Sequence, residues 1–376
     1  MGVLAAGAIG FAAAVAASVD PKAQAADPAS PLSSYCEPSA TAFDPTDVPP
    51  EGSGPVNVDG VRERRVTVDG VETRLLESGR RKAKTAVVFI HGSPGSGADL
   101  ADLLPQVSGR HNRAIAIDGP GYGQAEDAWG RPKTIEPGVR FMTRSLRKLG
   151  VRDVHLVGHD VGGAVGLEWG ARHPKRLRSA TLIDAGMLFD YRHHNLAQIS
   201  RTPGAGEAFW LQINRASFNA GIQDGQDPNR PLPPEFTNRL YDDLDRETRC
   251  TIIDLYRMTD EPEIDQIARD QAKALRKRER RPALVIWGAR DPYLPVKHAE
   301  EQRRGFPAAQ IEIFEDSGHF PFADNPERTR NLIVPFLRDA LAQDRGREPE
   351  RPSGDPSNGN RNRASGFSRG EPPRRR

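Results

Sequence analysis

The feature that most restricts how this chain can fold is a short, mostly apolar run that ends in a cluster of glycines. Residues 154–157 are followed by the sequence GHDVGG at 158–163 and then by an Ala- and Gly-rich stretch with a helical pattern. Where a strand turns sharply into a helix, the central residue is strained and side chains at the flanking positions would collide with neighbouring backbone. The pattern therefore predicts a strand–turn–helix elbow, with the side chain of Asp160 projecting above the edge of a sheet.

Short apolar runs recur along the chain and alternate with amphipathic stretches. The runs lie at 86–90, 114–117, 154–157, 180–183, 283–287 and 311–314, and helical patterns lie at 139–149, 163–172 and 328–341. Runs of this length are typical of parallel strands that are buried on both faces, and their alternation with helices indicates a doubly wound sheet. Apolar and polar residues alternate on both sides of Asp69-Gly70, which predicts a β-hairpin that precedes the parallel strands. The expected fold class is α/β, with a mostly parallel sheet.

The chain divides into five segments. Residues 61–185 and 282–342 form the predicted α/β core, and residues 186–281, where the strand pattern stops, form a predicted helical cap inserted into it. Residues 26–60 read as a flexible linker, and residues 343–376 read as a disordered basic tail, because neither stretch contains enough apolar groups to fold. From residue 345 onward the tail has nine Arg and four acidic residues, a net charge of +5.

The N-terminal segment 1–25 is expected to be a signal peptide or an N-terminal anchor. Residues 2–19 are small and apolar, and Ala23-Gln24-Ala25 resembles a signal-peptidase site, although no basic residue precedes the run. The expected location is therefore outside the cytoplasm, secreted or membrane-anchored, and cytoplasmic if the segment is not a functional signal. Membrane association is expected only through this segment.

Charge and cysteine content exclude some classes of partner. The 53 basic and 51 acidic residues leave a formal net charge of only +2, so nucleic acid is not an expected partner. No cofactor motif and no Cys/His cluster for a metal is present, so no cofactor is expected. Cys36 and Cys250 are compatible with one disulfide or with two free thiols, and the sequence leaves both open.

Other polar residues follow predicted strands and complete a candidate catalytic triad with Asp160. Asp291 follows the run at 283–287 and His319 follows the run at 311–314, which gives the chain order nucleophile, acid, histidine. Asp184, directly after the run at 180–183, is the alternative acid. The backbone N–H groups of Ser93 and Val161 are expected to form an oxyanion hole.

These motifs resemble the α/β-hydrolase superfamily over about residues 61–342, and the GHDVGG elbow resembles its epoxide hydrolase and haloalkane dehalogenase branch. The resemblance implies that Asp160 attacks an alkyl carbon and forms an ester, which water activated by His319 then hydrolyses. Attack on an acyl carbon would instead give a labile anhydride, which disfavours esterase chemistry. A small apolar organic substrate is expected.

The leaving group distinguishes the two enzymes of that branch. Epoxide hydrolases hold the ring oxygen with two cap tyrosines, and Tyr256 resembles one of them. At the position expected for the other tyrosine the chain has Trp210, and Tyr191 or Tyr241 could take its place. We therefore predict an epoxide hydrolase.

Haloalkane dehalogenases hold the halide with several N–H donors, and here Val161, Ser93 and Trp210 occupy the expected positions. Only the indole of Trp210 offers a side-chain N–H, and a desolvated anion needs more than one donor. Haloalkane dehalogenase is the first alternative. An esterase-like hydrolase and a non-catalytic ligand-binding relative are the others.

Overall fold

The computed structural model describes residues 35–36, 53–126, 135–278 and 280–346, and eight strands in these ranges form one sheet. The strands are β1 (Arg62–Val68), β2 (Val71–Gly79), β3 (Thr85–Ile90), β4 (Arg113–Ile117), β5 (Asp153–His159), β6 (Leu177–Ile183), β7 (Ala283–Gly288) and β8 (Gln310–Phe314). Their order is β1-β2-β4-β3-β5-β6-β7-β8, with β1–β2 and β2–β4 antiparallel and the other pairs parallel. The predicted α/β class is confirmed. The predicted leader, most of the linker and nearly all of the tail lie outside the described residues.

Helices and short 3-10 turns connect the strands. They are η2 (Gly97–Leu103), α2 (Leu104–Val107), α3 (Ile135–Lys148), α4 (Val161–Arg172), α5 (Asn195–Arg201), α6 (Ala205–Gln212), α7 (Arg215–Ile222), α8 (Pro234–Asp242), α9 (Arg246–Arg257), α10 (Glu261–Arg276), α11 (Lys297–Glu301), η3 (Gln302–Arg304), α12 (Pro321–Asp324) and α13 (Pro326–Gly346). Among the described residues, no helix combines the length and apolar character needed to cross a membrane.

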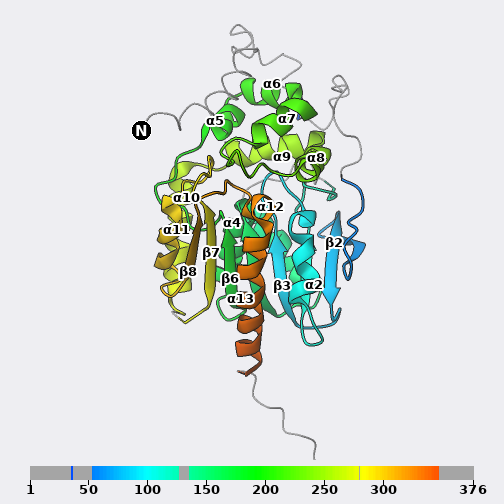
Figure 1. Ribbon diagram of the computed structural model, residues 1–376, viewed down its shortest axis with the longest axis vertical. Coiled ribbons are helices and arrows are strands. Elements are labelled where there is room, and N and C mark those ends of the chain that lie inside the picture. Colours follow the sequence, from blue (N-terminus) through cyan, green and yellow to red (C-terminus); the bar gives the residue numbers. More distant parts are fainter. Residues whose placement is uncertain (1–34, 37–52, 127–134, 279, 347–376) are drawn as a thin grey trace, which may run out of the picture.

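The sheet separates two apolar clusters because successive residues of each strand face opposite sides. Val88 and Leu156 pack in the cluster shared with α3 and α4, whereas Val87 and Val157 pack in the cluster shared with α2 and α13. Both faces of the sheet are therefore covered, which explains why its central strands are almost continuously apolar (Figure 1).

The inserted helices lie above the sheet at the carboxyl ends of its parallel strands (Figure 1). α5 to α9 make up this layer, with α5 packed on both α6 and α9. α10 instead packs on α4, because its Ala268, Ala272 and Leu275 belong to the same apolar cluster as Leu167 of α4. The part of the predicted cap that covers the sheet edge therefore ends with α9 rather than at residue 281.

A buried ion pair fixes the loops that follow β3 and β4. Arg74 Nε lies 3.0 Å from Asp118 Oδ2, and neither side chain is exposed. The carboxylate of Asp118 also accepts the backbone N–H of Gly97 at 2.7 Å and that of Gln124 at 2.8 Å. Because its charge is shared among these donors, Asp118 holds both loops against the sheet edge.

The two cysteines form a disulfide, which decides between the two states that the sequence left open. The bond joins Cys36 to Cys250 of α9 and so ties the N-terminal region to the inserted helices. Beside it Tyr35 is buried, and its carbonyl oxygen accepts a 2.6 Å hydrogen bond from Arg246. The helix that carries Tyr256 is thus covalently anchored to a segment 214 residues away in sequence.

We predict that loss of this disulfide destabilises the fold. A cross-link between residues so far apart restricts the unfolded chain, so the Cys36→Ser/Cys250→Ser variant should lose roughly 2–5 kcal/mol of unfolding free energy. Urea unfolding of the oxidised wild type and the variant measures the difference. A reducing agent should lower the stability of the wild type and leave that of the variant unchanged. Equal unfolding curves for the oxidised wild type and the variant would contradict the prediction.

Candidate active site

Asp160 occupies a strained turn between β5 and α4, as the glycine pattern predicts. Its backbone angles are φ 50° and ψ −129°, a conformation that non-glycine residues rarely adopt. A Cβ atom on Gly162 would lie 2.3 Å from the carbonyl oxygen of His91, and one on Gly158 would lie 2.6 Å from the Cα atom of Gly163. Only glycine therefore fits at these two positions, and the turn holds Asp160 above the sheet edge.

The structure brings Asp160, His319 and Asp291 together from the ends of three strands. His319 Nδ1 lies 2.7 Å from Asp291 Oδ2, and His319 Nε2 lies 3.7 Å from Asp160 Oδ2. The other oxygen of Asp291 accepts the backbone N–H groups of Tyr293 at 2.8 Å and Leu294 at 2.9 Å. One acid therefore orients the histidine, and the opposite ring nitrogen faces the other acid.

Burial and charge act in opposite directions on the His319–Asp291 pair. Burial alone would lower the pKa of His319, but the charge of Asp291 and their hydrogen bond raise this pKa above its ordinary value of 6.5. Burial would raise the pKa of Asp291, but the positive charge of His319 and the same hydrogen bond lower it. Asp291 is therefore ionised at neutral pH, and His319 is a stronger base than a free imidazole.

Asp184, the alternative acid, lies behind the pair rather than in contact with Nδ1 of His319. It is fully buried, and its Oδ1 accepts the backbone N–H of Gly288 at 2.9 Å. A carboxylate oxygen of Asp184, a carboxylate oxygen of Asp291 and a ring nitrogen of His319 all lie within 4.8 Å of one another. Burial, followed by the charge of Asp291, raises the pKa of Asp184 well above its ordinary value and so favours its protonated form. The 2.7 Å hydrogen bond between His319 and Asp291 leaves no space for a metal ion between them.

The predicted oxyanion donors flank Asp160. The backbone N–H of Ser93 donates to Asp160 Oδ1 at 2.9 Å, and Val161 is the first residue of α4. The hydroxyl of Ser93 accepts a 3.0 Å hydrogen bond from Tyr122, a residue that the sequence analysis did not select. The loop after β3 is thus fixed with one donor directly on the candidate nucleophile.

Two further histidines orient the loops of the site. The Nε2 atom of His159 lies 2.9 Å from the carbonyl oxygen of His319, which only accepts, so His159 donates. The Nε2 atom of His91 accepts the backbone N–H of Gly119 at 2.9 Å. Burial, and then the charge of His319, lowers the pKa of His159 to about 3, so it is neutral in this role.

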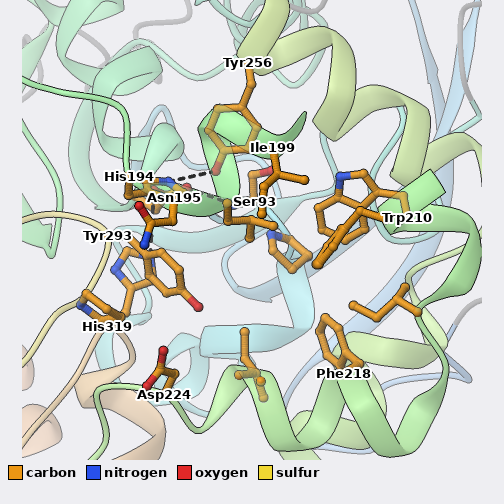
Figure 2. Close-up of a pocket in the computed structure, with 18 of the residues that line it drawn as sticks. Ser93, His194, Asn195, Ile199, Trp210, Phe218, Asp224, Tyr256, Tyr293 and His319 are labelled. Carbon is orange, nitrogen blue, oxygen red and sulfur yellow. Dashed lines mark hydrogen bonds and ion pairs between the residues drawn. The ribbon is translucent and has the colours of Figure 1, made fainter. Parts of the chain in front are cut away.

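A largely apolar cavity opens over Asp160 and His319, and Tyr256 of α9 borders it (Figure 2). The hydroxyl of Tyr256 lies 3.2 Å from Nε2 of His194, the residue that caps α5. Tyr293, two residues after Asp291, also lines the cavity. Neither His194 nor Tyr293 is predicted from the sequence, because the only local signal for Tyr293 is its closeness to Asp291 and His194 has no such signal.

The other cap residues of the sequence prediction are placed differently from one another. Trp210 borders the cavity with its ring (Figure 2). Its Nε1–H, however, donates to the hydroxyl of Ser200 at 3.0 Å. Tyr191 lines a second cavity that also reaches Asp160. Tyr241 lines neither cavity, since it packs behind Phe218 with ring centroids 5.7 Å apart. The expectation that Tyr241 substitutes for a cap tyrosine is therefore wrong.

Comparison with known proteins extends these observations. The family model for the alpha/beta hydrolase fold matches residues 85–326. The dihydrolipoyllysine-residue acetyltransferase component of the acetoin cleaving system of Pseudomonas putida is 27% identical over 74% of this chain and 70% of its own length. A haloalkane dehalogenase of Agrobacterium fabrum is 31% identical over 42% of this chain and 52% of its own. The crystal structure of haloalkane dehalogenase DatA from Agrobacterium tumefaciens C58 superposes with a TM-score of 0.64 at 23% identity, covering 75% of this chain and 98% of that one, and shows the shared fold.

We predict that the charge of Asp291, and not Asp184, sets the basicity of His319. Asp291→Asn removes that charge, so the pKa of His319 should fall below its wild-type value, as measured by NMR titration of the imidazole. The raised pKa of His319 stabilises the folded protein below pH 6.5, and this stabilisation is lost as the pH rises through the pKa of His319 in the folded protein. The Asp291→Asn variant should therefore lose unfolding free energy mainly at acidic pH. Asp184→Asn changes the acid to which Nδ1 of His319 is not hydrogen-bonded, and it is the matched control. If the pKa of His319 fell further in Asp184→Asn than in Asp291→Asn, this assignment would be contradicted.

Proposed function

The chain belongs to the α/β-hydrolase fold family, and from that premise we propose that it hydrolyses an epoxide to a diol through a covalent ester of Asp160. One observation carries the choice of an epoxide: the cavity above Asp160 is bordered by the hydroxyl group of Tyr256, whose oxygen is held by His194. An epoxide oxygen that becomes an alkoxide needs a hydrogen-bond donor of this kind.

The hydrogen bonds around His194 leave the Tyr256 proton available to a substrate. The backbone N–H of Ala197 donates to Nδ1 of His194 at 3.3 Å, so Nδ1 carries no proton. Burial lowers the pKa of His194 to about 3, so the ring is neutral and its single proton is on Nε2. Nε2–H therefore donates to the oxygen of Tyr256, and the hydroxyl proton of Tyr256 is free to point into the cavity.

In the first step a carboxylate oxygen of Asp160 attacks one ring carbon, and the bond from that carbon to the epoxide oxygen breaks. Tyr256 donates a hydrogen bond and then its proton to the oxygen that leaves. Burial and the nearby charge of Asp160 raise the pKa of Tyr256 well above 10, so its hydroxyl is protonated before reaction. The product of this step is a hydroxyalkyl ester of Asp160.

In the second step His319 takes a proton from water, and the resulting hydroxide adds to the ester carbonyl carbon of Asp160. The N–H groups of Ser93 and Val161 hold the oxyanion, and Asp291 stabilises the imidazolium that forms. Collapse of this intermediate releases the diol oxygen, which takes the proton from His319. The remaining carboxyl proton returns to Tyr256, so the sum is epoxide plus water to diol.

Dehalogenation is the second candidate, because relatives of this chain are named haloalkane dehalogenases. It requires N–H donors for the halide, and the indole of Trp210 is engaged by Ser200. Without that donor the departing anion would be poorly stabilised in an apolar cavity. The geometry therefore favours an oxygen leaving group.

We predict that a His319→Ala variant accumulates the covalent ester, because it lacks the base for the second step. The variant is incubated separately with styrene oxide and with 1-bromobutane, and intact-protein mass spectrometry followed by digestion locates any adduct. An adduct on Asp160 from the epoxide alone is expected. The Asp160→Ala/His319→Ala variant is the control and should remain unmodified. An adduct from the bromide alone would favour dehalogenation, and no adduct from either compound would contradict the proposal.

We also predict that Tyr256→Phe slows ring opening roughly 10²-fold, since loss of one transition-state hydrogen bond costs about this much. The measured quantity is the rate of adduct formation with styrene oxide in the His319→Ala background. Tyr241→Phe removes the same hydroxyl from a tyrosine that lines neither cavity, and its rate should stay within about threefold of the parent. Equal rates for both variants would rule out Tyr256 as the oxygen donor.

A further inference from the structure

Two cavities meet at the site, and Asp160 and Tyr256 belong to the walls of both. The first, named the α7 chamber, lies among the inserted helices and has an empty volume of about 930 Å³, which includes space open to solvent. The second, named the α10 chamber, lies toward α10 and has a corresponding volume of about 790 Å³. A reacting group held between Asp160 and Tyr256 would therefore border two cavities.

The α7 chamber is bordered by apolar side chains from several inserted helices (Figure 2). Ile199 of α5, Trp210 of α6 and Phe218 of α7 form much of this wall. Polar groups, among them Asn195 and Asp224, stand toward the His319 side. This chamber is suited to an apolar substituent that extends away from His319.

The α10 chamber is apolar on most of its surface as well. Leu188, Ile264 and Ile267 line it, together with Leu294 from the loop after β7. Its polar members include Gln271, whose amide donates to the carbonyl oxygen of Ala164 at 3.3 Å. A second apolar substituent therefore finds a separate cavity that Asp160 and Tyr256 also border.

Neither chamber offers a Lys or Arg counterion for an anionic substrate, and the imidazole of His319 is already paired with Asp291. Among the described residues that line the two chambers, none is Lys or Arg, and the acids are Asp160 and Asp224. A carboxylate on either arm of a substrate would be desolvated without a partner, which is costly. The two arms are therefore expected to be uncharged.

We propose that the substrate is an uncharged internal epoxide that bears an apolar substituent on each ring carbon, with one substituent in the α7 chamber and the other in the α10 chamber. This inference rests on the proposed function. Asp160 attacks the ring from the side opposite its oxygen, and Tyr256 holds that oxygen. The bond between the two ring carbons then lies across the line from Asp160 to Tyr256, and the substituents diverge from it on both sides.

The test compares two isomers of the same composition. trans-5,6-Epoxydecane has a butyl group on each ring carbon, whereas 1,2-epoxydecane has one octyl group on a single carbon. Because both arms of the internal isomer are buried, the wild-type kcat/KM for it should exceed that for the terminal isomer at least 10-fold. Equal values, or a preference for the terminal isomer, would overturn the inference.

Matched variants assign the arms to the chambers. Ile199→Trp narrows the α7 chamber and Ile264→Trp narrows the α10 chamber, and both isoleucines are half-buried on helix surfaces. Each Trp variant should lower kcat/KM for the internal isomer at least 10-fold. For the terminal isomer, kcat/KM should fall at least 10-fold only in the variant that narrows the chamber that holds the octyl chain. Circular dichroism and thermal unfolding verify that both variants fold, and Ile199→Ala and Ile264→Ala should keep the preference for the internal isomer. An internal-isomer rate that either Trp variant leaves unchanged would overturn the inference.

Styrene oxide separates failure of this inference from failure of the proposed function. If the wild type hydrolyses styrene oxide but shows no preference between the decane isomers, the two-chamber substrate is wrong and the epoxide hydrolase proposal stands. If neither styrene oxide nor either decane isomer gives a diol with the wild type or an adduct on Asp160 in His319→Ala, both proposals fail together.

Discussion

The backbone turn at Asp160 is the constraint on which the rest of the site depends. The turn is possible only because Gly158 and Gly162 lack side chains that would collide with Gly163 and with the chain that follows β3. A larger residue at position 162 would displace the backbone at His91, and with it the nearby N–H of Ser93 that donates to Asp160. One local strain, of order 1–3 kcal/mol, therefore places Asp160, the proposed nucleophile, beside the backbone N–H of Ser93.

Behind the turn, two buried carboxyl groups differ in how well their negative charge is stabilised. His319 and two backbone N–H groups stabilise the charge of Asp291 and lower its pKa, whereas Asp184 accepts one backbone N–H and burial raises its pKa. Two carboxylates so close together in an apolar interior cannot both ionise. The number of local donors thus explains why His319 is oriented by the acid that follows β7 and not by the one that follows β6.

The inserted helices contribute the side chains that border the cavity above Asp160. Tyr256 and His194 lie on α9 and at the start of α5, two helices that pack together above the sheet. The disulfide joins the N-terminal region to α9 at Cys250, less than two turns before Tyr256. The position of Tyr256, the proposed oxygen donor, is therefore set by helix packing and a covalent cross-link, and not by the sheet.

The sequence by itself determined the sheet, the elbow and the triad, because these depend on local patterns. Apolar runs mark buried strands, glycines mark the turn, and Asp291 and His319 directly follow strands whose carboxyl ends meet at one edge. Only the tertiary structure decided that Cys36 pairs with Cys250, that the Trp210 indole is engaged by Ser200, that Tyr241 is remote and that His194 orients Tyr256. The physical reason is that these contacts join helices whose apolar faces can pack in many ways, and the direction in which each side chain points is settled only when the helices meet.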